Sequence, residues 1–453
     1  MYERWMTIQI GAALVRSAQN KYVRTAEQGD AGLSAPTDQV AGMPALIVAA
    51  GRSAKAENNR RDRFMVRLAK RITESSRKSF GMYARAAALG TDAGDLIHME
   101  LGSPHADTPL HIKQATINAL MAGDVHYSHF QGIPKLREAL ATRLREKNDM
   151  DVSASDVVVT NGLTHASFAA FMALLDPGDE AILLEPYYPQ HIGKIELAGA
   201  KPVLAPLDAS DRFSIKAELI EPKITARTKM IVLINPCNPT GRVYSREELE
   251  VLADIARRHD LVVVSDEVYE EILFDGARHV SIASLPGMKE RTISMFAFTK
   301  SFAMDGWRLG YLTAPAHLIE GILKITTNDV THVNTFIQAG ALAAVSGPEE
   351  ILAELVTEDK VKRDIVVSRL NQMSGVTCDW PEGTIYAFPK IAALGLKSQD
   401  MAERIMTEAG VVVEAGSFYG ACGEGHLRVC FGSQSLARVN EAMDRLQRFF
   451  GSL

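Results

Sequence analysis

Residues 230–266 decide the fold, and they read MIVLINPCNPTGRVYSREELEVLADIARRHDLVVVSD. The apolar runs Met230–Ile234 and Leu261–Val264 predict two buried strands. Between them, Ser245–Arg258 has helical periodicity, and its first residue forms an S-x-x-E capping box with Glu248. A strand, a helix and a second strand in this order predict two parallel strands joined by a crossover helix.

The same alternation continues on both sides of this unit. Further strands are predicted at Val157–Thr160, Ala181–Leu184, Pro202–Ala205 and Ile293–Phe298, and further helices at Thr164–Leu175, Ile192–Leu197 and Pro348–Met373. Nearly continuous apolar strands separated by helices indicate a parallel sheet that is covered on both faces. We therefore expect an α/β fold, with a three-layer α/β/α large domain around a mostly parallel sheet and a smaller α+β domain. In such sheets ligands bind at the carboxyl ends of the strands.

The long helix predicted at Pro348–Met373 marks the change between the two domains, because short strands near Ile385 and Val411 follow it. We expect residues 110–352 to form the large domain. Residues 63–109 and 353–453 are expected to form the small one.

Residues 1–62 differ from the rest of the chain. They are rich in Ala, Gly, Ser, Asn and Arg and show no lasting hydrophobic period, which predicts a poorly ordered tail. A start codon placed too far upstream, with Met65 as the true start, explains this segment equally well.

The composition excludes several classes of protein. The 453 residues are 47% hydrophobic and carry 49 basic against 55 acidic side chains, a net charge of −6, so we expect no nucleic-acid partner. Apolar stretches such as Ala45–Ala50 fall far short of the roughly 20 residues that span a bilayer, so we expect no membrane segment. The four cysteines form no CxxC pair, which favours a reducing, cytoplasmic location. The histidines lack the spacing of a metal site, so we expect no metal.

Polar residues follow two of the predicted strands. Asn161-Gly162-Leu163-Thr164 leads from a strand into a helix, where free N–H groups and a hydroxyl could bind an anion, although a simple strand-to-helix turn has the same residues. The loop Asn235–Gly241 contains two Asn-Pro pairs and a Gly, which favour a fixed, non-helical loop that could hold the Asn238 amide at a strand end.

Charged residues occupy two more strand ends. Asp266 comes directly after an apolar strand, where an unpaired carboxylate is costly, so it either faces a cation or caps the next helix. Lys300 lies between Phe298 and Phe302; such a setting lowers the pKa of an ammonium and leaves a nucleophilic amine, whereas most lysines are solvated surface charges. Arg308 follows and could hold a phosphate.

Taken together, these segments resemble a known family. Asn238-Pro239-Thr240-Gly241, Ser265-Asp266-Glu267-Val268-Tyr269, and Thr299-Lys300 leading into Ala303-Met304-Asp305-Gly306-Trp307-Arg308 are similar to the signature of the pyridoxal-phosphate-dependent aminotransferases of fold type I, class I/II. Order and spacing agree over roughly residues 65–453. The resemblance implies an enzyme that moves an amino group between an L-amino acid and a 2-oxo acid, with pyridoxal 5′-phosphate bound in the large domain.

The resemblance also implies a role for each residue of the site. Lys300 would form the Schiff base with the cofactor and then move the substrate proton. Asp266 would pair with the ring nitrogen, and Tyr269 and Asn238 would hydrogen-bond the phenolic oxygen of the ring. The remaining cofactor contacts would come from the phosphate-binding Arg308, Thr164, Thr299 and backbone of Leu163, and from the ring-stacking Tyr188, for which Tyr187 is an alternative.

Three further segments extend the resemblance. Leu101-Gly102-Ser103-Pro104 is similar to the glycine loop that closes over the substrate, and Gly102 allows close backbone approach. His126-Tyr127-Ser128 is similar to the segment whose tyrosine reaches the cofactor phosphate of the neighbouring subunit, which implies a homodimer with shared active sites. Arg428, in a strand-like stretch, would bind the substrate α-carboxylate with two parallel hydrogen bonds.

Two departures from the family pattern affect these expectations. Ala297 stands where many relatives have Ser or Gly, so a hydroxyl contact to the phosphate would have to come from Thr299. Thr164 stands where some acid-specific relatives have Lys, which disfavours aspartate or prephenate and leaves neutral, aromatic and basic amino acids open.

Two alternatives to transamination remain. The same machinery also serves C–S β-lyases, aminocyclopropane-carboxylate synthases and oxidases of the same fold, since the residues that form the carbanion do not determine what becomes of it. The other alternative is a transcription regulator with an aminotransferase-like domain. Such a protein needs a DNA-binding module in front, and residues 1–62 show neither a helical period nor a basic stripe.

Overall fold

The computed structural model describes residues 67–75, 81–90 and 94–453. The predictions for residues 1–62 and for a start at Met65 lie outside these described residues. Among the residues that are described, no helix combines the length and apolar character needed to cross a bilayer.

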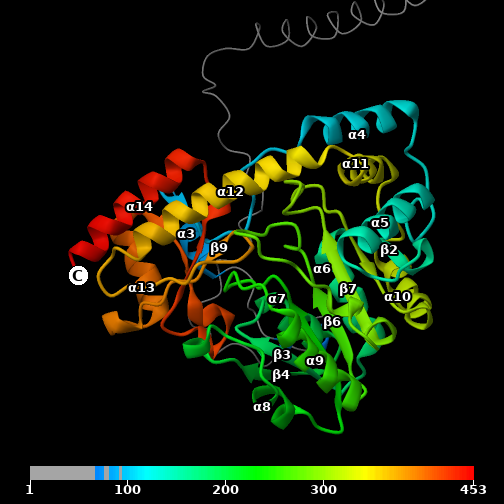
Figure 1. Cartoon of the computed structure of the whole chain (residues 1–453), viewed down its shortest axis with the longest axis horizontal. Coiled ribbons are helices and arrows are strands. Elements are labelled where there is room, and N and C mark those ends of the chain that lie inside the picture. The colour runs from blue at the N-terminus through cyan, green and yellow to red at the C-terminus, as the bar shows by residue number, and fades with distance from the viewer. Residues whose placement is uncertain (1–66, 76–80, 91–93) are drawn as a thin grey trace, which may run out of the picture. The chain divides into compact units, whose positions relative to one another are not determined.

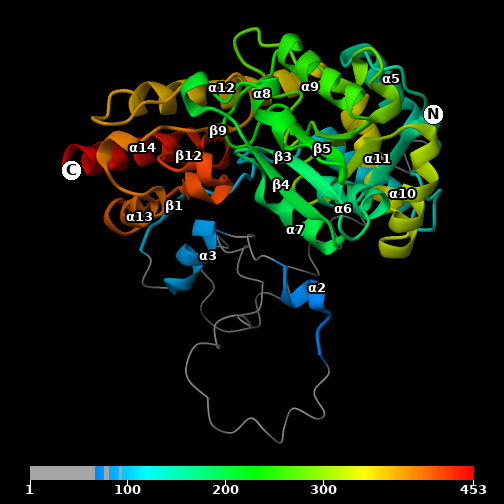
Figure 2. The ribbon, with the colours of Figure 1, turned by 90° about the horizontal axis from the view of Figure 1, so that it is seen from below.

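A seven-stranded sheet has the strand order β2-β8-β7-β6-β5-β3-β4 and lies between helices (Figures 1 and 2). Its strands are β2 (Val157–Thr160), β3 (Glu180–Glu185), β4 (Lys201–Pro206), β5 (Thr228–Ile234), β6 (Val262–Asp266), β7 (Thr292–Ala297) and β8 (Gly310–Thr313). Only β8 runs antiparallel to its neighbours, β2 and β7. The predicted mostly parallel sheet is therefore confirmed.

Helices cover both faces of the sheet because alternate strand residues point to opposite sides. Met230 and Val232 of β5 share a core with α6, α7 and α10, whereas Ile231 and Leu233 share a core with α9. A further core joins β2, β7 and β8 to α4, α5 and α11. These helices are α4 (Leu110–Ala122), α5 (Pro134–Lys147), α6 (Gly162–Leu174), α7 (Pro189–Leu197), α9 (Arg246–Arg258), α10 (Ala316–Asp329) and α11 (Thr335–Val345). The fold is thus the predicted three-layer α/β/α arrangement.

The predicted elements differ from the observed ones mainly at their ends. Helix α9 begins after Ser245, whose side chain forms the predicted capping box with Glu248. Strand β6 extends to Asp266, so this carboxylate belongs to the last strand residue and not to the loop after it. Helix α6 begins at Gly162, which places Leu163 and Thr164 in its first turn.

A second set of elements packs around its own core. A two-stranded sheet pairs β1 (Ile97–His98) with β10 (Val411–Val412), and a three-stranded antiparallel sheet has the order β11-β12-β9. The elements are β9 (Tyr386–Ala387), β11 (Glu414–Ala415), β12 (Leu427–Cys430), α3 (Gly81–Ala88), α12 (Glu349–Leu370), α13 (Ser398–Arg404) and α14 (Leu436–Gly451). Their core takes residues from 82–99, 269–274 and 366–450. The exact domain boundaries given above stay a prediction. Two four-residue helices, α2 (Lys70–Thr73) and α8 (Ala217–Ile220), complete the set of α-helices in the described residues.

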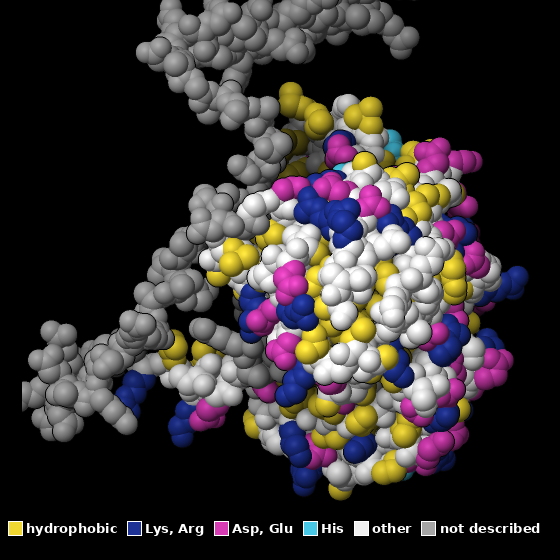
Figure 3. Space-filling model, turned by 90° about the vertical axis from the view of Figure 1, so that its left-hand side faces the viewer, with side chains coloured by type: hydrophobic (Ala, Val, Ile, Leu, Met, Phe, Trp, Pro, Cys, Tyr) yellow, Lys and Arg dark blue, Asp and Glu magenta, His cyan; other side chains and the backbone are white. Residues whose placement is uncertain are grey.

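The surface of this second part carries mixed charge. Lys and Arg side chains are interspersed with Asp and Glu on the face drawn in Figure 3. Several of them form ion pairs: Arg369 of α12 lies 2.6 Å from Asp444 of α14, and Arg438 and Arg445 of α14 each lie 2.8 Å from Asp95. These pairs connect segments that are far apart in the sequence.

Two neighbouring strands hold the loop that matters most for the site. β7 and β8 pair antiparallel with Ala297 opposite Gly310. The loop between them, residues 298–309, carries both Lys300 and Arg308. Its two ends are therefore held side by side by the sheet.

Candidate active site

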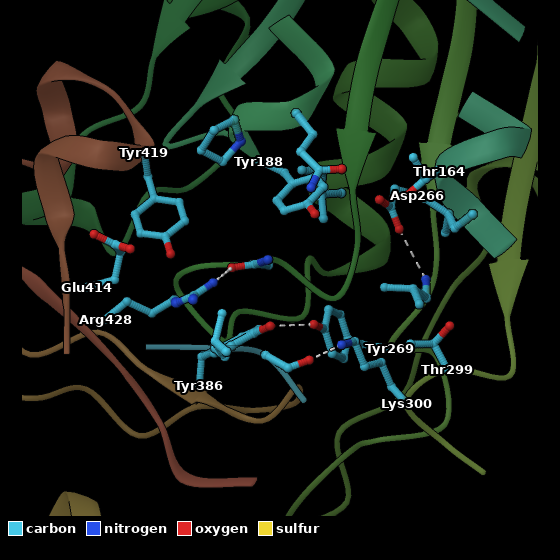
Figure 4. A pocket seen from close by; sticks show the side chains of 18 of the residues that line it. Thr164, Tyr188, Asp266, Tyr269, Thr299, Lys300, Tyr386, Glu414, Tyr419 and Arg428 are labelled. Atoms are coloured by element: carbon cyan, nitrogen blue, oxygen red, sulfur yellow. Dashed lines mark hydrogen bonds between the residues drawn. The ribbon is translucent and has the colours of Figure 1, made fainter. Parts of the chain in front are cut away.

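A cavity of about 350 Å³ lies at the carboxyl ends of β5 and β6 and is closed on its other side by β9, β11 and β12 (Figure 4). All but one of the predicted site residues line it: Gly102, Leu163, Thr164, Tyr188, Asn238, Asp266, Tyr269, Thr299, Lys300, Arg308 and Arg428. The sheet edge thus brings together residues from five separate segments of the large α/β part, and two further segments supply Gly102 and Arg428.

Lys300 supplies an amine inside this cavity. Its Nζ donates to the carbonyl oxygen of Gly102, and burial lowers the pKa of its ammonium to about 8. The flanking Phe298 and Phe302 pack against each other, with ring centres 5.8 Å apart, and belong to the core beside the sheet. These rings anchor the loop, and the lowered pKa makes Lys300 a nucleophile near neutral pH.

Gly102 approaches the site so closely that only glycine fits. A Cβ at this position would lie 1.9 Å from the hydroxyl oxygen of Tyr386. The predicted close backbone approach is therefore present, and it lets the Gly102 carbonyl accept from Lys300.

Asp266 ends β6 with its carboxylate buried; the residue is 4% exposed. The backbone N–H of Val268 donates to Oδ1 at 3.3 Å, and Nε2 of His191 lies 3.4 Å from Oδ2. His191 is fully buried, and burial lowers the pKa of its imidazole. With His191 neutral, the charge of the buried Lys194 acts on Asp266 from this side, and the carboxylate can also face a cation in the cavity.

An anion-binding cup forms where α6 begins. Leu163 and Thr164 lie in its first turn, where backbone N–H groups have no partner within the helix. Gly162 has φ +75°, and a Cβ there would lie 2.6 Å from Nη2 of Arg308. The missing side chain leaves a cradle in front of the guanidinium, and Thr299 lines the same cavity. These donors fit a phosphate group, since helix N-termini and arginine both bind one well.

Arg428 of β12 is held rigidly. It donates from Nη1 to Asn238 Oδ1 at 3.1 Å and from Nη2 to the carbonyl of Glu100. Its guanidinium carbon lies 4.3 Å from the ring centre of Tyr386 and 4.9 Å from that of Tyr419. Its buried Nε has no hydrogen-bond partner among the described residues. A fixed guanidinium with an unused donor suits a carboxylate ligand.

Tyr269 and Tyr386 both line the cavity, and their hydroxyl groups are hydrogen-bonded to each other. Oη of Tyr269 lies 2.7 Å from Oη of Tyr386. Burial raises the pKa of both phenols, that of Tyr386 to about 12, so both stay protonated at neutral pH. The predicted contacts of Tyr269 and Asn238 with a ring oxygen stay a prediction.

The structure distinguishes Tyr188 from Tyr187, the two candidates for the tyrosine that stacks on the ring. Tyr188 lines the cavity, with its ring 5.4 Å from that of His191. Tyr187 is 2% exposed and packs in the core beneath the sheet. Of the pair, Tyr188 is therefore the one in position to face a ligand.

Tyr127 is the one predicted residue that does not reach this cavity. Its side chain is exposed, and its ring contacts His332 edge-on at 5.3 Å. The prediction assigned Tyr127 to the site of a neighbouring subunit, so its position here leaves that prediction open.

Several residues that line the cavity were missed from the sequence. They are Tyr83, Glu100, Gln190, Ile234, Val268, Tyr386, Glu414, Phe418 and Tyr419. For two of them a signal was present: Glu100 and Glu414 are carboxylates inside short apolar strand-like runs, where an unpaired charge is costly. The aromatic residues gave no signal that distinguishes them from core.

Comparison with known proteins identifies the family of the chain. A family model described as aminotransferase class I and II matches residues 94–446. The chain is 38% identical over 357 residues to an aspartate aminotransferase of Pyrococcus abyssi, covering 78% of this chain and 91% of that protein. It is 37% identical to aromatic-amino-acid aminotransferase 2 of Thermococcus litoralis, with coverage of 78% and 91%. The crystal structure of an aromatic aminotransferase from Pyrococcus horikoshii superposes with a TM-score of 0.77 at 36% identity, covering 82% of this chain and 98% of that one.

Proposed function

The chain belongs to the class I and II aminotransferases, and from this premise we propose that its active site is the cavity around Lys300, Asp266 and Arg428. The enzyme is a pyridoxal-phosphate-dependent transaminase that moves an amino group between an L-amino acid and a 2-oxo acid. The observation that carries the site assignment is the Lys300 amine, whose pKa burial lowers to about 8, in one cavity with a buried carboxylate and two guanidinium groups.

Lys300 acts twice in this proposal. Its unprotonated amine would hold the cofactor through the cofactor aldehyde, and its free amine would accept the proton from the substrate α-carbon and donate it back. The lowered pKa supports both roles, because about a tenth of the amine is unprotonated at pH 7 when the pKa is near 8. The Gly102 carbonyl, which accepts from Nζ, holds the amine in the cavity.

When bound, pyridoxal phosphate supplies an aldehyde that accepts the amino group and a ring that withdraws electrons from the α-carbon. Asp266 holds the proton on the ring nitrogen, which keeps the ring electron-poor. Tyr269 and Asn238 donate to the oxygen on the ring. Asn238 Oδ1 already accepts from Arg428, so its Nδ2 is the donor left for this contact.

Arg308, Thr299 and the first turn of α6 would hold the phosphate, and Tyr188 would cover the ring face. Arg428 binds the α-carboxylate of both substrates, because amino acid and oxo acid carry the same group.

We further propose a homodimer in which Tyr127 reaches the phosphate of the other subunit. Residues 110–130 support this, since they expose many large apolar side chains: Leu110, Ile117, Leu120, Met121, Val125, Tyr127 and Phe130. A second copy of the chain would cover them. The cytoplasm is the proposed location, because the four cysteines are unpaired.

The test is a screen of the twenty L-amino acids against the cofactor-loaded enzyme, one at a time. A donor should bleach the visible absorbance of the bound cofactor and release the 2-oxo acid that keeps its side chain, identified by mass spectrometry. Release of pyruvate with ammonia and a thiol would indicate a C–S lyase, and consumption of oxygen an oxidase. If the protein bound no cofactor and no amino acid changed its spectrum, the proposal would be wrong.

A further inference from the structure

Two buried carboxylates line the active-site cavity without a role in the mechanism above. Glu100 follows β1 and is 2% exposed, and Glu414 begins β11 and is 4% exposed. Both lie close to Arg428: its Nη2 donates to the Glu100 carbonyl, and Glu414 is directly opposite Arg428 in the β11–β12 ladder. Figure 4 shows Glu414 beside Arg428 and Tyr419.

Glu100 has an unused oxygen. His98 Nδ1 lies 2.8 Å from Oε1, whereas the buried Oε2 has no hydrogen-bond partner among the described residues. An unsatisfied, buried carboxylate oxygen is costly, so its place in a ligand cavity suggests a donor that arrives with the ligand.

Among the described residues, the carboxylate of Glu414 accepts hydrogen bonds only from backbone N–H groups. Met82 donates to Oε2 at 3.1 Å, and Ala415 donates to Oε1 at 3.1 Å. Burial raises the pKa of this carboxyl; the charge of Arg428 opposes that effect, and the charge of Glu100 adds to it. Although Arg428 is its cross-strand neighbour, the described residues place neither Arg428 nor any other Lys or Arg within ion-pair distance of Glu414 or Glu100.

Once substrate is bound, the charge of Arg428 is shared between this pair and the substrate. In the proposed function its free donors go to the substrate α-carboxylate, which adds another negative charge nearby. Among the described residues, His98 is then the only basic side chain within ion-pair distance of either carboxylate, at Glu100. The remaining negative charge is costly to bury unless the substrate carries a cation.

We propose that Glu100 and Glu414 form an acidic subsite that binds the side-chain cation of a basic L-amino acid. This rests on the proposed function and names its substrate class. An ammonium or guanidinium can donate to Oε2 of Glu100 and to the carboxylate of Glu414, with the Tyr419 ring in the same wall. An acidic side chain would instead meet two like charges.

The experiment compares L-lysine with L-norleucine, which has the same number of carbons but lacks the terminal ammonium group. The measured quantity is kcat/KM for bleaching of the cofactor absorbance by the donor alone. A charge-assisted hydrogen bond predicts at least about tenfold preference of the wild-type enzyme for lysine. L-aspartate should be poorer than both.

Variants then test whether Glu100 and Glu414 cause the preference for lysine. Glu414→Gln and Glu100→Gln keep the shape and one acceptor oxygen but remove the charge, so each should lower kcat/KM for lysine about 10- to 100-fold and leave norleucine within about twofold. Glu408→Gln, at an exposed glutamate that pairs with Arg404, is the matched control and should change neither donor. Thermal unfolding checks that each variant is folded. The comparison of lysine with norleucine in the wild-type enzyme tests the proposal even if a variant does not fold.

Three results would overturn the inference. The first is a wild-type enzyme that prefers norleucine or aspartate to lysine. The second is an equal loss for lysine and norleucine in both variants, which would mean that the carboxylates only balance the charge of Arg428. In either case the enzyme still transaminates, so the proposed function stands. The third, no reaction with any amino acid, would overturn both.

Discussion

Replacing Arg428 by lysine tests the assignment of the α-carboxylate site. Arg428 donates to Asn238 and to the carbonyl of Glu100, and its guanidinium lies over the rings of Tyr386 and Tyr419. A lysine has a single nitrogen on a flexible stem. It cannot keep both protein contacts and also hold two carboxylate oxygens.

The size of the effect follows from the lost contact. A hydrogen bond between charged groups contributes about 1.5–3 kcal/mol. At tenfold per 1.4 kcal/mol, Arg428→Lys should lower kcat/KM about 10- to 150-fold. Because all amino acids and 2-oxo acids have the same α-carboxylate, the loss should be similar for every donor and every acceptor.

The assay measures kcat/KM for L-norleucine, L-phenylalanine and their 2-oxo acids in wild type and variant. Arg258→Lys, at an exposed arginine that pairs with Asp254 and Glu221, is the control and should change none of the four values. A loss confined to one side-chain class would show that Arg428 binds the side chain instead. Unchanged kcat/KM values would show that another residue binds the substrate α-carboxylate.

Four further predictions address the rest of the site. Lys300→Ala should abolish turnover and the visible absorbance of the bound cofactor, and an unchanged spectrum would contradict its role. Asp266→Asn should leave the cofactor bound but lower kcat about 100-fold or more, so near-normal rates would mean that the ring nitrogen has another partner. Cofactor capture by the apo-protein should speed up as pH rises through about 8, because the Lys300 ammonium then loses its proton; a rate independent of pH between 6 and 9 would refute this. Gly102→Ala should cost about 1–3 kcal/mol in denaturant unfolding, since its Cβ would meet Tyr386 at 1.9 Å, and an unchanged midpoint would show that the loop yields.

The fold could be predicted well where hydrophobic periodicity decides it. Six strands of the main sheet were predicted with bounds: β2 has its observed ends, and the other five differ by at most two residues at either end. The direction of β8 could not be predicted, because an apolar run of four residues carries no sign of whether its neighbours run parallel or antiparallel.

The site was predictable where a polar side chain ends a buried strand or loop, as with Asp266, Asn238 and Lys300. It was not predictable for Tyr386 and Tyr419, since a buried tyrosine in an apolar run has the same pattern whether it packs in a core or faces a ligand. His191 was missed for a related reason: it lies in the first turn of α7, and only the fold brings it to Asp266.

The loop between β7 and β8 carries Lys300 and Arg308 on one segment whose two ends are held by the sheet. Ala297 and Gly310 are neighbours in the ladder, so the amine of Lys300 and the guanidinium of Arg308 sit on a span whose two ends cannot slide apart. A substitution that disturbs this pairing would therefore displace the amine and the guanidinium together.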